Sequence, residues 1–278
     1  MREFGKQILV GLRTRGSDWW RSRPSHMIAG ALLFSFLVCA YVFIELAGEV
    51  VEGTPQQFDE WCVQSFRRAD DPALPIGPSW LREAGMDATA LGSPLVMLIA
   101  VTAAVGFLVI QGKRRLALTT VVMTSGGAML AAVLKYAIGR PRPTVVPHLR
   151  EVTTPSFPSG HAMLSAIVFL SIGVMLAHTV RKRRTKLYFL LWAAFLTFTV
   201  GTSRVYLGVH YPTDVLGGWL AGLAWALAAW AVVAFQPTSA RSIQQVVRHA
   251  RSLENGINGQ QDQPRTSVVR QIHHEDKS

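Results

Sequence analysis

The segment SRVYLGVHYPTD, residues 203–214, separates two long apolar runs of the chain. It places an arginine, a histidine and an aspartate together where a membrane-spanning segment would begin. His210 and Asp214 are four residues apart, so a helix that starts near Pro212 brings the carboxylate within reach of the imidazole. A carboxylate in that position orients a nucleophile or a base. The segment therefore predicts chemistry at the boundary between two apolar helices.

Six apolar stretches recur along the 278 residues, half of which are hydrophobic. Each stretch lacks Asp, Glu, Lys and Arg, and each is long enough to cross about 30 Å of hydrocarbon, which takes roughly 17–25 residues. The stretches are residues 27–44, 88–112, 116–134, 162–180, 187–203 and 215–240. They predict an all-α, polytopic membrane protein with six transmembrane helices. The alternative, a soluble domain with some of these helices buried, is allowed most readily by the short fifth stretch.

The distribution of charge predicts the orientation in the membrane. The formal net charge is +11, and the basic residues cluster in the leader, in GKRR after the second stretch and in RKRRTK after the fourth. Residues 45–87 instead hold nine acidic against three basic residues, as an exported loop does. We therefore expect the protein in the plasma or inner membrane, with both termini in the cytoplasm. Residues 139–158 and 204–213 then lie on the outer side.

Three parts follow from this pattern. Residues 1–26 are predicted to form a basic, amphipathic cytoplasmic leader, which either lies on the inner leaflet or is frayed. Residues 27–236 are predicted to form the membrane domain. Residues 237–278 are predicted to form a polar, disordered cytoplasmic tail. The outer loop, 45–87, either caps the membrane surface or is a plain connector. Anionic lipid headgroups are the expected partners of the basic residues, and nucleic acid is not, because no aromatic residues are interleaved with them.

Three polar clusters stand at the ends of apolar stretches on the predicted outer side: KYAIGRPRP, PSFPSGHAM and the opening segment. A lysine at membrane depth is costly unless it is paired or functional. Several cations beside a helix N-terminus form a site for a tetrahedral oxyanion, most simply phosphate. The candidate residues are Lys135, Arg140, Arg142, Ser159, Gly160, His161, Arg204, His210 and Asp214.

The two histidines suggest two proton-handling roles. An imidazole oriented by a carboxylate can attack phosphorus or activate water, and a protonated one can donate to the leaving oxygen. His210 has Asp214 as its carboxylate, whereas His161 has none nearby in sequence. We therefore assign attack to His210 and general-acid catalysis to His161. No metal or other cofactor is expected, because no group of histidines and carboxylates has metal-ligand spacing.

The three clusters, residues 135–214, resemble the signature of the phosphatidic acid phosphatase type 2 (PAP2) superfamily, K-x6-RP, PSGH and SR-x5-H-x3-D. Every signature position matches, in order, and the six-span layout extends the resemblance over most of the chain. It implies a helical core and a metal-independent lipid phosphate phosphatase. It also implies that His210 becomes a phosphohistidine oriented by Asp214 and that His161 protonates the leaving alcohol. The phosphate ligands implied by the resemblance are Lys135, Arg142, Arg204, Ser159 and Gly160.

Several alternatives stay open at this point. The lipid is undecaprenyl pyrophosphate, phosphatidylglycerophosphate, phosphatidic acid or a lipid A phosphate. One competing function is phosphate transfer to a second lipid. Another is the vanadium haloperoxidase branch of the superfamily, whose members are soluble. A third is a transporter with charged residues along its pathway. Arg140 lies outside the signature and is either a supporting residue behind the site or a pyrophosphate contact. Taken singly, Lys135 and Arg142 could also be cations snorkelling at a membrane edge. Oligomeric state is not predicted.

Overall fold

The computed structural model describes residues 25–150 and 152–235, and within them the chain is all-α, with one isolated β-bridge between Arg67 and Pro75. The predicted leader, except for its last two residues, and the whole predicted tail lie outside the described residues. The helices are α2 (Ser25–Glu52), α3 (Gln56–Ser65), α4 (Ser79–Ala90), α5 (Pro94–Ile110), α6 (Arg114–Ile138), α7 (Gly160–Thr179), α8 (Arg183–Tyr206) and α9 (Pro212–Phe235).

Four helices of the described part are long and apolar enough to cross a membrane. These segments are Met27–Glu52, Arg114–Ile138, Gly160–Ala177 and Arg183–Tyr206. The pair α4 and α5 makes a fifth if it is counted as one span. This count supports a multi-pass membrane protein. The six spans expected from sequence remain a prediction, with α9 in the place of the sixth.

The second expected span, residues 88–112, is not one continuous helix. α4 ends at Ala90, α5 begins at Pro94, and the two are bent by 49°. Ser93 caps α5 by accepting a hydrogen bond from the backbone N–H of Val96 at 3.4 Å. Proline lacks a backbone N–H and disfavours helical geometry in the residue before it, so Ser93–Pro94 starts a new helix within an apolar run. Hydropathy alone does not register this break.

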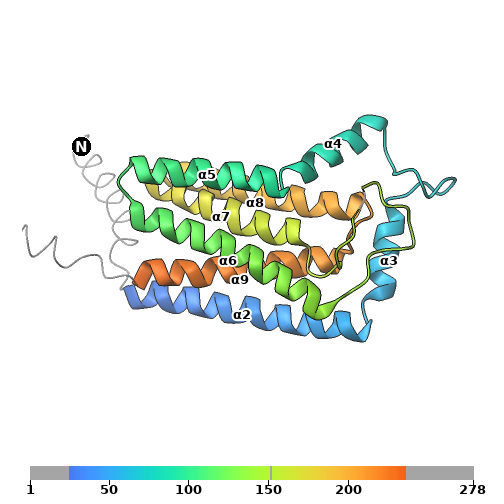
Figure 1. Cartoon of the computed structure of the whole chain (residues 1–278), viewed down its shortest axis with the longest axis horizontal. Helices are drawn as coiled ribbons and strands as arrows, with labels where there is room; N and C mark the ends of the chain where they lie inside the picture. Colours follow the sequence, from blue (N-terminus) through green and yellow to red (C-terminus); the bar gives the residue numbers. More distant parts are fainter. Residues whose placement is uncertain (1–24, 151, 236–278) are drawn as a thin grey trace, which may run out of the picture. The chain divides into compact units, whose positions relative to one another are not determined.

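The long helices pack side by side, and α3 crosses one end of the bundle (Figure 1). α9 packs closely on α7 because Gly218 and Gly222 present no side chain to it. A Cβ at Gly218 would lie 2.6 Å from the Ser159 carbonyl oxygen, and one at Gly222 would lie 2.6 Å from that of Met163. Small residues four apart allow this approach of two membrane helices. The contact sets the first turns of α7 and α9 beside each other.

Apolar side chains also cover the outside of the bundle. On α2, Phe34 is 69% exposed and Ile44 is 65% exposed, and on α6 Leu118 is 65% exposed. Such faces are costly in water but are satisfied by lipid tails. The exposed apolar surface is therefore consistent with a bundle surrounded by hydrocarbon.

Residues 66–76, within the predicted outer loop, pack on the end of α8. Arg67 donates from Nη1 to the carbonyl oxygen of Tyr206 at 2.8 Å, and the Tyr206 hydroxyl donates to the carbonyl oxygen of Ile76 at 3.1 Å. Phe66 meets the Tyr206 ring edge-on, with 6.0 Å between the centroids. These contacts hold the loop at the end of the bundle where α8 finishes.

Candidate active site

The residues predicted to form the site lie at one end of the bundle. Lys135 is in the last turn of α6 and Arg204 in the last turn of α8. Gly160 begins α7, and Asp214 lies in the first turn of α9. Figure 1 shows these four helix ends at the end of the bundle that α3 crosses. The three sequence clusters, far apart along the chain, therefore share one location.

His210 and Asp214 form a buried pair at the start of α9. His210 Nδ1 lies 3.3 Å from Asp214 Oδ2, and the two residues are 1% and 0% exposed. His210 precedes the helix, which begins at Pro212, so the turn between them, and not a shared helical face, brings the groups together. The same carboxylate oxygen accepts the backbone N–H of Tyr211 at 2.8 Å and the hydroxyl of Ser156. These donors fix the carboxylate beneath the imidazole.

Arg142 lies on the other edge of the His210 ring. Its Nη1 is 3.2 Å from His210 Nε2 and donates to the Val209 carbonyl oxygen at 2.6 Å. Its Nε donates to the Thr154 carbonyl oxygen at 2.7 Å, and its Nη2 to the Thr154 hydroxyl at 3.1 Å. A proton on Nδ1, facing Asp214, leaves the Nε2 lone pair directed toward this guanidinium. An oxyanion bound by Arg142 would therefore meet the free nitrogen of the imidazole.

Lys135 and Gly160 lie in contact on another side of the site. A Cβ at Gly160 would be 3.4 Å from Lys135 Cε, and Lys135 Nζ donates to the Pro155 carbonyl oxygen at 2.7 Å. An ammonium has three N–H donors, so two remain for a ligand. Arg142 and Arg204 lie near enough to Lys135 for electrostatic repulsion between the cations. Such a group of like charges favours a bound anion.

The N-terminus of α7 faces the same region. Ser159 is the N-cap, fully buried, and its Oγ accepts from the backbone N–H of Ala162 at 3.5 Å. Its own backbone N–H donates to the Asp214 carbonyl oxygen at 2.9 Å. The N–H groups of Gly160 and His161 belong to the first turn, where no acceptor exists within a helix. Those two donors and the helix dipole suit an anion.

Two buried nitrogen atoms at the site have no hydrogen-bond partner within the described residues. They are Arg204 Nε and His161 Nε2. Arg204 is 1% exposed, and its Nη1 donates to the Thr89 hydroxyl at 2.8 Å. Leaving such groups unpaired is costly, so each calls for a ligand atom. Arg204 Nε and His161 Nε2 are therefore available to a ligand at this end of the bundle.

Arg140 is a supporting residue behind the pair. It is 6% exposed and donates from Nη1 to Asp214 Oδ1 at 2.7 Å and to the Thr213 hydroxyl at 2.8 Å. Its Nη2 donates to Asp59 Oδ2 at 2.7 Å. Both ends of the guanidinium are thus occupied by carboxylates. This arrangement favours the supporting role over a contact with pyrophosphate.

The electrostatic surroundings keep the His210 imidazole neutral. Burial is the largest cause and lowers the pKa of His210 to about 3. The cations Arg142 and Arg204 act in the same direction, against the carboxylate of Asp214. Burial also lowers the pKa of Arg142, although a guanidinium stays charged. A neutral imidazole beside a cation is the form required of a nucleophile.

Several supporting residues were not identified from the sequence. They share a role as hydrogen-bond partners of the predicted residues, and they are Asp59, Thr89, Thr154, Ser156 and Thr213. Ser156 lies two residues before the PSGH motif, which is the one sequence signal that could have marked it. Thr89 and Asp59 come from the region before the signature and carry no motif of their own.

All charged side chains that are buried in the described part belong to the end of the bundle described above. They are Asp59, Arg67, Arg140, Arg204 and Asp214. A transport pathway would place ionisable groups near the middle of several spans.

The described residues contain no group of three or more histidine, cysteine or carboxylate side chains that could hold a metal ion.

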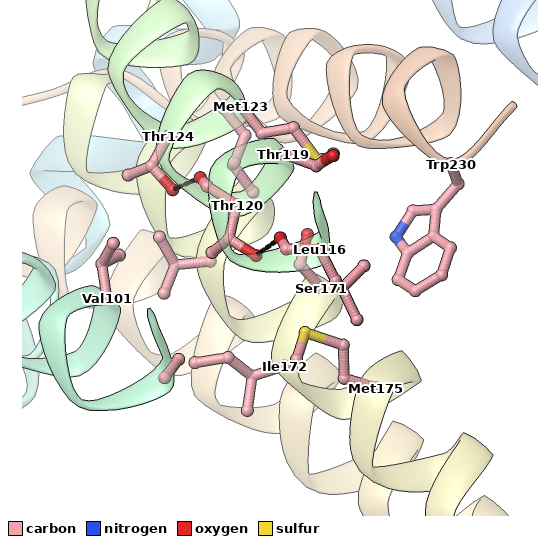
Figure 2. Close-up of a pocket in the computed structure, with 13 residues that line it drawn as sticks. Val101, Leu116, Thr119, Thr120, Met123, Thr124, Ser171, Ile172, Met175 and Trp230 are labelled. Atoms are coloured by element: carbon pink, nitrogen blue, oxygen red, sulfur yellow. Dashed lines mark hydrogen bonds between the residues drawn. The ribbon is translucent and has the colours of Figure 1, made fainter. Parts of the chain in front are cut away.

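A separate apolar cavity lies between α5, α6, α7 and α9 (Figure 2). The Thr120 hydroxyl, labelled there, donates to the Leu116 carbonyl oxygen, and the Thr124 hydroxyl donates to the Thr120 carbonyl oxygen. Met175 and Trp230 line it from the far ends of α7 and α9. The lining residues named for this cavity include no charged side chain. The cavity is distinct from the cluster of cations.

Comparison with known proteins assigns this arrangement to one family. The family model of the PAP2 superfamily matches residues 114–237, which contain every predicted site residue. Phosphatidylglycerophosphatase B of Bacillus subtilis (strain 168) is 33% identical over 184 residues, 65% of this chain and 86% of that protein. An undecaprenyl-diphosphatase of Sulfolobus acidocaldarius is 30% identical over 120 residues, 41% of this chain and 54% of that protein.

One solved structure extends the likeness to the fold. It is the crystal structure of a transmembrane PAP2-type phosphatidylglycerolphosphate phosphatase from Bacillus subtilis, 28% identical to this chain. The similarity covers 74% of this chain and 99% of that one, with a TM-score of 0.66. The shared fold therefore includes more of the chain than the signature region alone.

Proposed function

This chain belongs to the PAP2 superfamily, and on that premise we propose that it removes phosphate from a lipid phosphate or pyrophosphate through a phosphohistidine at His210. The reaction takes place on the outer face of the plasma or inner membrane, with the lipid tail among the helices. Both termini are then cytoplasmic. The position of His210 between Asp214 and Arg142, with Nε2 3.2 Å from Arg142 Nη1, is the observation that carries the proposal.

In the bound state, the phosphoryl oxygens are held by a group of positive charges and by N–H donors of the α7 N-terminus. The proposed ligands are Lys135, Arg142, Arg204, Ser159 and Gly160. A close approach is possible at Gly160 because it has no side chain. The cations also stabilise charge on the equatorial oxygens in the transition state, which is the main contribution a protein makes to phosphoryl transfer.

In the first half-reaction, the Nε2 lone pair of His210 attacks phosphorus and the bond from phosphorus to the lipid oxygen breaks. Asp214 holds the Nδ1 proton and stabilises the positive charge that develops on the ring. The leaving oxygen takes a proton from His161, whose Nε2 is buried and unpaired within the described residues. A phosphate dianion among these cations favours the protonated form of His161.

In the second half-reaction, water attacks phosphorus and the bond to His210 Nε2 breaks. His161, now neutral, accepts a proton from that water, so its role reverses between the two steps. Phosphate leaves and His210 returns to the neutral imidazole. For a pyrophosphate the leaving group is the lipid monophosphate, and the balance of bonds and protons is unchanged.

The relatives point to the first substrates to test. Two of the similar proteins are named as a phosphatidylglycerophosphatase and an undecaprenyl-diphosphatase. We therefore propose phosphatidylglycerophosphate as the leading candidate, with undecaprenyl pyrophosphate and a lipid A phosphate next, since two further relatives are named lipid A 1-phosphatases, and phosphatidic acid last. The coverage of 86% of the phosphatidylglycerophosphatase puts that lipid first.

The test is release of phosphate by the detergent-purified full chain, without added metal, from each of the four lipids. We expect turnover of at least one lipid and its loss in His210→Ala. Silence on all four from folded protein would refute the phosphatase and favour transfer to another lipid or a non-catalytic role. Unchanged turnover by His210→Ala would refute the proposed nucleophile.

A further inference from the structure

Asp59 is a buried carboxylate in the first turn of α3, outside the signature region. It is 0% exposed, whereas its neighbours Phe58 and Trp61 are 56% and 64% exposed. The helix therefore directs Asp59 inward, toward the start of α9. Burying a carboxylate is costly unless charged or hydrogen-bonding partners compensate for lost water. A carboxylate with that orientation on a short helix of an outer loop requires a reason.

The partners of Asp59 all belong to the immediate support of the catalytic pair. Its Oδ2 accepts from Arg140 Nη2 at 2.7 Å and from the hydroxyl of Thr213. Its Oδ1 accepts the backbone N–H of Thr213 at 3.2 Å. Thr213 directly precedes Asp214 in α9. Asp59 thus contacts both the residue before Asp214 and the guanidinium paired with it.

Arg140 transmits this contact to Asp214. Its guanidinium carbon lies 4.4 Å from the centroid of the Tyr211 ring, and its Nη2 also donates to Gln56 Oε1 at 3.2 Å. Its Nη1 donates to Asp214 Oδ1 at 2.7 Å. A planar guanidinium held at both ends and over one face has little freedom to turn. The position of Oδ1 is therefore fixed from the side of α3.

We propose that Asp59 is a positioning residue for the reaction, which through Arg140 holds the Asp214 carboxylate in register with His210. The inference rests on the proposed function. Because Oδ1 of Asp214 is occupied by Arg140, Oδ2 faces His210 Nδ1, together with the Ser156 hydroxyl and the Tyr211 backbone N–H. Rotation of the carboxylate would break that division and move the imidazole relative to phosphorus. Displacements of about 1 Å cost on the order of a hundredfold in rate.

Asp59 also maintains the charge of the support. Arg140 alone would neutralise Asp214, so the pair would oppose the positive charge on phosphorylated His210 only weakly. With Asp59 ionised, the three groups carry one net negative charge. Electrostatic stabilisation of the ring in the transition state then persists although Asp214 is paired.

The test compares Asp59→Asn with wild type in steady-state turnover of the lipid that wild type dephosphorylates. We expect kcat to fall about tenfold to a hundredfold with KM within twofold. The inhibition constant for inorganic phosphate should also stay within twofold, because Asp59 does not contact the proposed phosphate ligands. The matched control is Asp70→Asn, which alters an exposed carboxylate paired with Arg68 on the same loop and should leave kcat unchanged.

A second variant keeps the proposal testable if Asp59→Asn folds poorly. Arg140→Lys retains the charge but cannot bridge two carboxylates with two parallel N–H groups, so it should lose kcat in the same range with phosphate inhibition unchanged. The double variant, Asp59→Asn with Arg140→Lys, should be no more than twofold slower than the slower single variant. This non-additivity is expected of residues acting in one chain of contacts.

Three results would overturn the inference. The first is a kcat within twofold of wild type for folded Asp59→Asn or for Arg140→Lys. The second is a kcat loss in Asp59→Asn that is accompanied by weaker phosphate inhibition and a lower melting temperature, which would indicate a structural role. The third is an additive loss in the double variant. A wild-type protein silent on every lipid would instead refute the proposed function itself, and the positioning role with it.

Discussion

Arg142 Nη1 lies 3.2 Å from His210 Nε2, on the opposite edge of the ring from Asp214, whose Oδ2 is 3.3 Å from Nδ1. The imidazole thus lies between a carboxylate that can hold its proton and a cation that can hold an anion. This geometry separates the two functions of the ring nitrogens. A phosphate bound at Arg142 meets the lone pair, while the proton stays on the far side.

The role of His161 predicts a dependence on the leaving group. His161→Ala should lose about 10²–10⁴-fold in the rate of the first half-reaction on a lipid phosphate, because an alkoxide cannot depart without a proton. On p-nitrophenyl phosphate, whose leaving group needs no protonation, that loss should be under tenfold. The measurement is the single-turnover rate of leaving-group release from each substrate for wild type and variant, which does not include the later attack of water on the phosphohistidine. Equal losses on the two substrates in this step would show that His161 is not the general acid.

Substitution of a phosphate-binding arginine should weaken binding and turnover together. Arg142→Lys removes the fork that contacts Thr154, Val209 and the edge of His210, so kcat/KM should fall about 10²-fold or more. The inhibition constant for inorganic phosphate should rise at least tenfold. The matched control is Arg184→Lys, at an exposed position at the start of α8, the end of that helix far from Arg204. Wild-type phosphate inhibition in Arg142→Lys would contradict the assignment.

The lowered pKa of His210 predicts that its imidazole stays neutral at physiological pH. With a pKa of about 3, caused mainly by burial, the ring should not gain a proton between pH 8 and pH 5. In ¹³C-histidine NMR of the substrate-free protein, the signal that disappears in His210→Gln should not shift over that range. A midpoint near pH 6.5 for that signal would contradict this account of the site.

The same pKa shift has a consequence for stability. Between pH 6.5 and about 3, an unfolded histidine binds a proton that folded His210 does not. The contribution of His210 to stability is therefore complete above pH 6.5 and is lost as the pH falls toward 3. The melting temperature of wild type should thus fall more steeply with decreasing pH than that of His210→Gln. Parallel declines would contradict the shift.

A chelator should leave turnover unchanged. The proposed ligands of phosphate are lysine and arginine side chains and backbone N–H groups, which supply the positive charge directly. Incubation with EDTA should alter phosphate release by less than twofold in purified protein. Strong inhibition, reversed by a divalent cation, would require a metal site that the proposal does not contain.

The sequence predicted the residues that gather at the end of the bundle better than the residues that support them. Lys135, Arg142 and His210 could be singled out because charged residues at the ends of apolar runs are costly and therefore conspicuous. The spacing of His210 and Asp214 was informative even though the histidine lies before the helix. Asp59 gave no such signal, because its contact with Arg140 joins residues 81 apart and depends on how α3 packs at the end of the bundle.

The fold shows the same division. The apolar runs predicted the long helices, since membrane spans are defined by length and hydropathy. The break between α4 and α5 was missed although Ser93 and Pro94 are clear helix-start residues. Hydropathy averages over such a dipeptide, so a run of uniform apolar character hides the change of direction.

The central claim, attack by His210, is tested most directly by trapping the phosphorylated protein. Wild type mixed with excess ³²P-labelled phosphatidylglycerophosphate, or the best lipid of the panel, should be quenched in alkali within the first turnover and digested to peptides. The account predicts label in an alkali-stable, acid-labile linkage on the peptide that contains His210, and none in His210→Ala. Label at another residue, or rapid turnover with no labelled protein at any time, would contradict it.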